Sequence, residues 1–255
     1  MFLSTAADNH RARALYESLG GGLAEHGPTV NYWFRLDGAG ISGTRADDRA
    51  IAEYFLLGAE TAATLLGRPE LAERWDQLSA LDGFTVGQLA GHFVRAVGVT
   101  NVALARGEAE EDPIASLPEW YAGRIDSWSD RADEIRSNAS GEATLGAAGL
   151  PARYQAAVSE CWDLLGSAPP NSVRVQGGDV LSLGDYLLVR AVELVTHADD
   201  LAASLGQQPP AFPGRLVGAV TALLVDVARV RHGEMGVLRA LARRERDAVQ
   251  ALRVI

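Results

Sequence analysis

Apolar residues recur with helical spacing through most of the chain after residue 45. Two expected helix starts have the form of a capping box, at residues 85–88 and 116–119, and the second has Pro118 in its first turn. No convincing strand pattern follows residue 45, so we expect an all-α fold there. The periodicity predicts helices at about 46–66, 86–106, 117–138, 145–167, 182–205 and 213–231, with a shorter helix near 234–250.

The first 36 residues follow a different pattern. Residues 9–20 are typical of a short helix closed by a glycine run, and residues 29–36 have the aromatic and β-branched content of a strand. Residues 37–44 are rich in glycine and indicate a linker. We therefore expect an N-terminal extension at 1–40 and a helical domain at 45–255, with its core at 45–206 and a helical extension at 207–255.

The predicted helix at 182–205 carries four polar residues on an otherwise apolar background. Arg190, Glu193, His197 and Asp200 are spaced by three, four and three residues. At about 100° per residue they fall within about 80° of one another and share one face. Burying such groups without partners costs several kcal/mol each. Something in the interior must therefore satisfy them, and a metal ion is one candidate.

His92 lies in the middle of another apolar helix, where its small neighbours Gly87 and Gly91 would let a helix or a ligand approach closely. Alone, such a histidine is more often a hydrogen-bonded core residue. A glutamate and a histidine four apart are also common as a surface pair. Together, however, His92, Glu193 and His197 would provide the two imidazoles and one carboxylate of a catalytic zinc site, with a fourth position left to water or substrate.

Composition narrows the choice of function class. A net charge of −10 argues against a general nucleic-acid binder, and the mixed-charge stretch at 242–247 indicates a solvated face of a terminal helix. No stretch reaches the roughly 20 apolar residues of a membrane span. Charged residues occupy the place of a signal-peptide core, so we expect a cytoplasmic protein. The single cysteine, Cys161, agrees with a reducing compartment and is expected to be a buried structural thiol.

Two segments together resemble the mycothiol-dependent maleylpyruvate isomerase family of the DinB-like superfamily. They are residues 74–92, ending in Thr-Val-Gly-Gln-Leu-Ala-Gly-His, and residues 190–201, Arg-Ala-Val-Glu-Leu-Val-Thr-His-Ala-Asp-Asp-Leu. The resemblance covers residues 45–206 and extends towards 231–246. It implies a four-helix bundle in which His92, Glu193 and His197 bind a divalent metal ion, with zinc as the expected ion.

The resemblance also implies a chemistry. In this family the partners are a small electrophilic substrate such as maleylpyruvate and a low-molecular-weight thiol, mycothiol, whose thiolate adds to a double bond or transfers to another molecule. Arg190 would orient the carboxylate of Glu193 or receive a substrate carboxylate. Asp200 is expected to fix the tautomer of His197 or to form a helix-end hydrogen bond, rather than to be a fourth ligand.

The chain departs from the family at both ends. The isomerase is expected to carry an α/β C-terminal domain, whereas the residues after Gly206 look helical. Residues 9–20 and the strand after them resemble the last helix and strand of a GNAT-type N-acetyltransferase. Such a piece lacks the upstream loop that holds acetyl-coenzyme A in that family. We therefore expect an inert N-terminal remnant.

Two functions from different classes remain open at this stage. One is a metal- and thiol-dependent isomerase or transferase. The other is a non-catalytic metal-binding bundle, for example a homodimeric binding or regulatory module. They differ in the fourth coordination position, which must open to a cavity in the enzyme and can be closed in the binding module.

Overall fold

The computed structural model describes residues 2–6, 22–23, 29–33, 48–129, 131–166, 169–243 and 252. The chain divides into two compact units, Met1–Thr44 and Arg45–Ile255. The described part of the first unit is an antiparallel sheet in the order β1-β3-β2. Its strands are β1 (Phe2–Ala6), β2 (Gly22–Leu23) and β3 (Thr29–Trp33).

The strand predicted at 29–36 is confirmed over Thr29–Trp33, and its two partner strands were not predicted. The helix predicted at 9–20 and the linker at 37–44 lie outside the described residues. The resemblance of this region to an N-acetyltransferase therefore stays a prediction.

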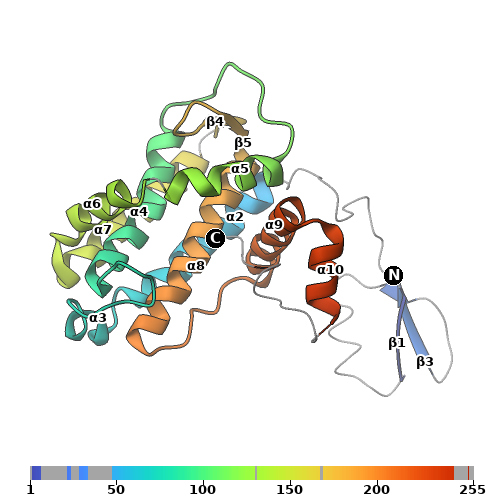
Figure 1. Cartoon of the computed structure of the whole chain (residues 1–255), viewed down its shortest axis with the longest axis horizontal. Coiled ribbons are helices and arrows are strands. Elements are labelled where there is room, and N and C mark those ends of the chain that lie inside the picture. Colours follow the sequence, from blue (N-terminus) through green and yellow to red (C-terminus); the bar gives the residue numbers. More distant parts are fainter. Residues whose placement is uncertain are drawn as a thin grey trace. The chain divides into compact units, whose positions relative to one another are not determined.

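The described residues of the second unit are mainly helical, which confirms the predicted all-α class (Figure 1). Four of its helices, α2, α4, α7 and α8, pack into the DinB-like four-helix bundle that the family resemblance implies. The helices are α2 (Asp48–Ala62) with the short 3₁₀ turn η1 (Ala63–Leu65), α3 (Pro69–Glu73), α4 (Val86–Leu104), α5 (Leu117–Ser129), α6 (Ala132–Ala143), α7 (Gly146–Gly166), α8 (Leu183–Leu205), α9 (Gly214–His232) and α10 (Glu234–Ala242).

Aromatic side chains join three helices of the bundle at its centre. Phe93 of α4 stacks on Tyr154 of α7, with ring centroids 5.2 Å apart. The hydroxyl of Tyr154 donates a hydrogen bond of 3.0 Å to the carbonyl of Ala59 on α2. Because this phenol is fully buried, its hydroxyl needs a partner, and the bond fixes α7 against α2.

The sequence also anticipates how α4 and α8 begin or end. The hydroxyl of Thr85 accepts from the backbone amide of Gln88, and the Gln88 side chain accepts from the amide of Thr85, which confirms the capping box. Helix α8 ends at Gly206, whose φ of 68° is in the left-handed region that glycine adopts without strain.

Two predictions about the secondary structure are wrong. The helix predicted at 117–138 is two helices, α5 and α6, because Arg131 has non-helical backbone angles. Serine and aspartate just before it favour helix ends over helix interiors, and Asp133 and Glu134 suit the first turn of a new helix. A strand hairpin was also missed, β4 (Ser172–Arg174) with β5 (Val180–Ser182).

The hairpin packs against the start of α8, and Gly177 and Gly178 in its turn both have positive φ. Three-residue strands are too short for a period of two to stand out in the sequence. The C-terminal helices predicted after residue 206 are confirmed in α9 and α10. The helix predicted near 234–250 ends earlier, at Ala242, because Arg243 has extended backbone angles; residues 244–250 lie outside the described residues.

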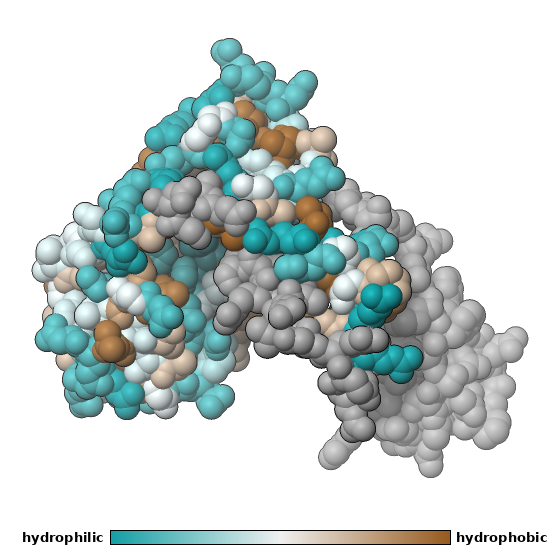
Figure 2. Space-filling view, in the orientation of Figure 1, coloured by the Kyte–Doolittle hydropathy of each residue, from teal (hydrophilic) through white to brown (hydrophobic). Residues whose placement is uncertain are grey.

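None of the described helices combines the length and apolar character that a membrane crossing requires. On the face shown in Figure 2, the described surface is mostly hydrophilic, and apolar residues form small separate patches. Isolated apolar side chains of this kind are normal for a protein surface.

Glycines bring other groups close to α4 near His92, as the sequence predicts. A Cβ atom on Gly91 would lie 2.4 Å from the backbone oxygen of Ala139 on α6. A Cβ atom on Gly87 would lie 2.5 Å from the indole of Trp75. These two positions therefore allow α6 and Trp75 to pack directly on the backbone of α4.

We expect Gly91→Ala to lower the free energy of unfolding by about 1–3 kcal/mol, because the added methyl group meets a backbone oxygen that cannot turn away. Gly141→Ala is the matched control, since Gly141 is an exposed helix residue with open space around it. That substitution should stabilise the protein by about 0.5–1 kcal/mol. Urea unfolding of both variants checks the prediction, and equal stability of the two would contradict it.

Candidate metal centre

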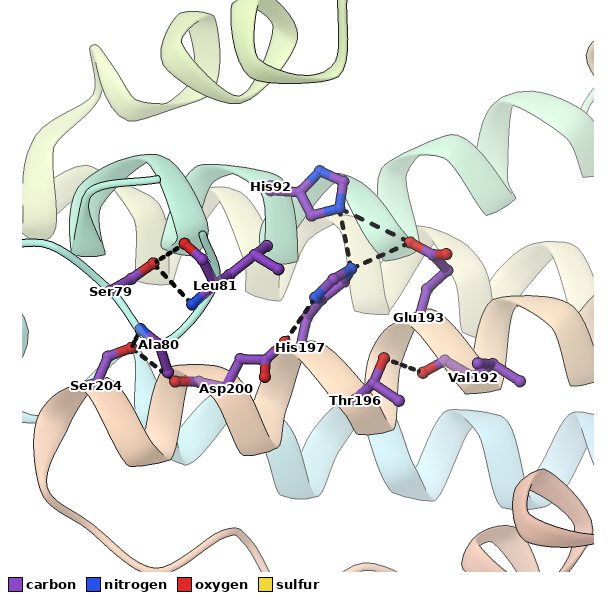
Figure 3. A network of polar contacts seen from close by, with 10 residues as sticks. All are labelled: Ser79, Ala80, Leu81, His92, Val192, Glu193, Thr196, His197, Asp200 and Ser204. Atoms are coloured by element: carbon purple, nitrogen blue, oxygen red, sulfur yellow. Dashed lines mark hydrogen bonds and ion pairs between the residues drawn. The ribbon is translucent and has the colours of Figure 1, made fainter. Parts of the chain in front are cut away.

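Three side chains predicted from the sequence converge between α4 and α8 (Figure 3). His92 comes from α4, and Glu193 and His197 come from successive turns of α8. The Nε2 atoms of the two histidines are 3.1 Å apart. The Oε2 atom of Glu193 lies 3.7 Å from Nε2 of His92 and 3.4 Å from Nε2 of His197. Two nitrogens and one oxygen thus surround a common point.

The spacing of these donor atoms can be compared with that around a zinc ion. Donors about 2.0–2.1 Å from a tetrahedral zinc ion lie about 3.4 Å from one another. The three measured separations, 3.1, 3.4 and 3.7 Å, scatter around this value. Two imidazoles and a carboxylate are also donors that zinc accepts. The residues present could therefore hold a divalent metal ion with little rearrangement.

Asp200 binds the far side of the His197 ring. Its carboxylate oxygen lies 3.1 Å from Nδ1 of His197, three residues earlier on α8. With the Nδ1 proton donated to this carboxylate, Nε2 is the atom that faces His92 and Glu193 (Figure 3). A carboxylate on the outer nitrogen also makes an imidazole a stronger metal donor.

The loop before α4 is attached to α8 just beyond this carboxylate. The hydroxyl of Ser204 donates to the carbonyl of Asp200 at 2.7 Å and accepts from the backbone amide of Ala80 at 2.9 Å (Figure 3). The guanidinium of Arg74 donates to the carbonyl of Ser204 at 3.0 Å. These bonds hold the last turns of α8 beside the segment that leads into α4.

The charges of the cluster depend on one another. Burial alone would lower the pKa of His197, but hydrogen bonds to Asp200 and Glu193 outweigh it and raise the pKa to about 9. Burial would raise the pKa of Glu193, but hydrogen bonds to His197 and His92 hold the pKa well below its usual range. Burial lowers the pKa of His92. Without a metal ion, the cluster therefore holds an anionic Glu193, a cationic His197 and a neutral His92 near neutral pH.

The donor cluster opens into a cavity of about 720 Å³. The lining includes His92, Glu193 and His197, so a fourth coordination position on this side would be accessible to a small molecule. Phe84, Val99 and other apolar residues of the lining form a wall of the kind that suits the carbon skeleton of a ligand.

Arg190, the fourth member of the polar stripe, also lines the cavity. Its Nη2 atom donates a hydrogen bond to the carbonyl oxygen of Ala96 on α4, and the two atoms are 3.1 Å apart. Among the described residues, its Nε atom is buried and has no hydrogen-bond partner. Its charge is one of the weaker causes, after the histidine hydrogen bonds, of the lowered pKa of Glu193. Arg190 thus affects Glu193 through its positive charge and not through a hydrogen bond.

Several further residues that line the same cavity were not predicted from the sequence. Arg95 lies three residues after His92 on α4, and Tyr186 lies one turn before Arg190 on α8. Helical spacing from the known candidates could have identified both. The arginines from α5, α7 and β4 could not be found in this way, because only the fold brings them to the cavity.

Cys161 takes no part in the site. The residue is buried on α7, as predicted, and burial raises the pKa of its thiol to about 12. A thiol with this pKa stays protonated near neutral pH and is a poor nucleophile.

Comparison with known proteins gives one family match. Residues 55–202 match the family model described as mycothiol maleylpyruvate isomerase N-terminal domain. This segment includes α4 and all of α8 up to residue 202, and therefore the whole donor cluster. No curated protein and no solved structure matches the chain.

The raised pKa of His197 predicts a pH dependence of stability in chelator-treated protein. The folded-state pKa of about 9 exceeds the ordinary value of 6.5. The stability that this shift contributes is fully present below pH 6.5 and is lost as the pH rises through about 9. His92 and Glu193 have lowered pKa values and so titrate below this window.

Urea unfolding between pH 6.5 and 9 should therefore show a falling free energy of unfolding for the wild-type chain. In Asp200→Asn the fall should be clearly smaller, because the variant lacks the carboxylate that stabilises the imidazolium. Parallel curves for the two proteins would show that Asp200 does not hold a proton on His197.

Proposed function

The chain belongs to the mycothiol maleylpyruvate isomerase N-terminal domain family, and from this premise we propose that it is a divalent-metal-dependent enzyme. Its cosubstrate is a low-molecular-weight thiol of the mycothiol type, and its substrate is a small electrophile such as maleylpyruvate. The single observation that carries the proposal is the cluster of His92, Glu193 and His197 at the wall of an open cavity.

We assign the metal to the three donors of this cluster, with zinc as the preferred ion. The donor separations support this assignment, and so does the lowered pKa of Glu193, which supplies the negative charge that offsets a cation. Asp200 keeps Nε2 of His197 directed at the other donors. A bound divalent ion would lower the pKa of a thiol or water in its open position.

The cavity is the place for the thiol and the electrophile. Its volume of about 720 Å³ is within the range of small-molecule sites and exceeds the needs of a small acid alone. The thiolate sulfur would form a bond to one carbon of the substrate double bond, and the displaced π electrons would move onto the conjugated carbonyl group as an enolate, which leaves a single bond that can rotate. Return of these electrons expels the same thiolate and restores the double bond in the other configuration, so no further reactant is consumed.

Arg190 is the residue that we expect to act on the substrate. Its bond to the Ala96 carbonyl fixes the guanidinium beside the cluster, and its Nε atom has no partner among the described residues. A guanidinium held in this way can bind a carboxylate and stabilise negative charge that develops next to the carboxylate during thiol addition.

Zinc content tests the metal assignment. Glu193→Gln should weaken zinc binding strongly while changing shape little, and His92→Ala should do the same from the other helix. Asp200→Asn should weaken binding by only about 10- to 100-fold, as is typical of residues that support a ligand. His232→Ala, outside the cluster, is the matched histidine control.

Chelator should lower the melting temperature of wild type and of His232→Ala, because an ion that binds only the folded state stabilises it. The melting temperature of Glu193→Gln should hardly move. Equal zinc stoichiometry in wild type, His92→Ala and Glu193→Gln, measured by metal analysis, would exclude this site.

Thiol dependence tests the reaction. Zinc-loaded wild type should isomerise maleylpyruvate when mycothiol is added, as followed by the change in substrate absorbance. Glu193→Gln should lose at least about 100-fold of this rate, because the loss of several kcal/mol of charge stabilisation has an effect of this size. Wild type that binds zinc and mycothiol but accelerates no thiol addition or isomerisation would instead be the non-catalytic metal-binding module.

A further inference from the structure

The cavity next to the donor cluster is far more basic than the chain that forms it. The protein has a net charge of −10, and all 23 of its basic residues are arginines. Among the described residues, seven of the 26 that line the cavity are arginines, against three glutamates and no aspartate. A cavity with this lining attracts anions locally, although the molecule as a whole repels them.

Four of the seven cavity arginines are paired with carboxylates. Arg190 donates to a neutral acceptor, the carbonyl of Ala96, and keeps its charge for the role proposed above. In the four paired arginines the ion pair offsets the charge of the guanidinium, so these residues contribute mainly to the structure of the cavity. The ion pairs are Arg124 with Asp179, Arg131 with Glu134, Arg153 with Glu142 and Arg174 with Glu111.

Arg95 and Arg106 differ from the others. Within the part of the chain that the structure describes, neither forms a hydrogen bond or an ion pair, although both line the cavity. Arg106 is exposed and follows the end of α4, far from the donor cluster. Arg95 is half-buried and lies inside α4. Among the described residues, Arg95 is therefore, besides Arg190, the cavity arginine that has no carboxylate partner and lies near the candidate metal ligands.

The position of Arg95 follows from the helix itself. Arg95 follows His92 by three positions, so it lies about 60° around the helix and about 4.5 Å further along the axis. Both side chains reach the same cavity. An acidic group held by Arg95 would therefore share the cavity with the donor cluster.

Glu134, whose carboxylate interacts electrostatically with Arg95, does not neutralise it. The pKa of Glu134 is lowered first by hydrogen bonds from Arg131, and the charge of Arg95 is the weakest of the causes. Both carboxylate oxygens of Glu134 accept from the Arg131 guanidinium, each at 2.8 Å. Glu134 is thus occupied by Arg131, and the positive charge of Arg95 remains available to a ligand.

We propose that Arg95 determines the specificity of the cavity by binding an oxyanion of the ligand, a carboxylate or a phosphate. The reaction of a ligand bound in this way rests on the proposed function. Anion binding by Arg95 does not, because it requires neither metal nor thiol. A guanidinium forms paired hydrogen bonds with either group, and a half-buried guanidinium forms them in partial shelter from water. A neutral ligand of the same shape would leave this cation unpaired and would bind more weakly.

Calorimetric titration of chelator-treated, full-length protein with two small anions tests the proposal. The probes are succinate and inorganic phosphate, with succinamide as the neutral analogue of succinate. The variants are Arg95→Gln, Arg95→Lys and the matched control Arg239→Gln, which removes an exposed arginine of α10 that does not line the cavity. Circular dichroism of each variant verifies that the helical fold is retained.

Wild type and Arg239→Gln should bind at least one of the two anions, and with equal affinity. If the carboxylate is the preferred group, both proteins should bind succinamide at least about tenfold more weakly than succinate. Arg95→Gln should weaken binding of the preferred anion by at least about tenfold, and Arg95→Lys should recover part of it. Stronger binding of succinate or of phosphate identifies the group that the site prefers.

Three results would overturn the proposal: equal anion affinity of Arg95→Gln and wild type, equal loss in Arg239→Gln, or no binding of either anion by wild type. Since metal and thiol are absent from the titration, these outcomes are independent of whether zinc binding or thiol-dependent activity is found.

Discussion

Partial burial of charged and polar side chains between α4 and α8 is the constraint on which the site depends. Removing groups of this kind from water is costly unless they find partners. Here the partners are other members of the same set: Glu193 is bound by both histidines, and His197 also binds Asp200. The apolar core around Phe93 holds the two helices at the separation that makes these contacts possible. The bundle thus supplies the rigidity, and the charges supply the chemistry.

The sequence predicted what depends on local geometry and missed what depends on tertiary structure. Spacing along one helix was enough to place Glu193, His197 and Asp200 on a common face. Spacing could not join His92 to them across about a hundred residues. Donor chemistry made His92 one candidate for the third ligand, and the family resemblance implied the complete set. The hairpin β4–β5 was missed because its strands are too short for a clear period, and the break before Arg131 was masked by continuous helical composition.

The role of the cavity arginines also could not be predicted from the sequence. Arg95 is on a predictable face of α4, but its importance is visible only when Arg131 is seen to occupy Glu134. The whole chain has a net charge of −10, whereas the described residues that line the cavity include more arginines than carboxylates. Net charge therefore bears on partners that contact the whole surface and says little about a ligand held inside.

The anchor of Arg190 has an evolutionary consequence. The guanidinium is bound to the main-chain oxygen of Ala96, not to a side chain, and that oxygen also accepts from the hydroxyl of Thr100. A mutation at position 96 can therefore change the size of a residue that lines the cavity and still keep the acceptor that fixes the arginine. Relatives built on this plan can diverge in ligand shape at one position while inheriting the placement of a charged group unchanged.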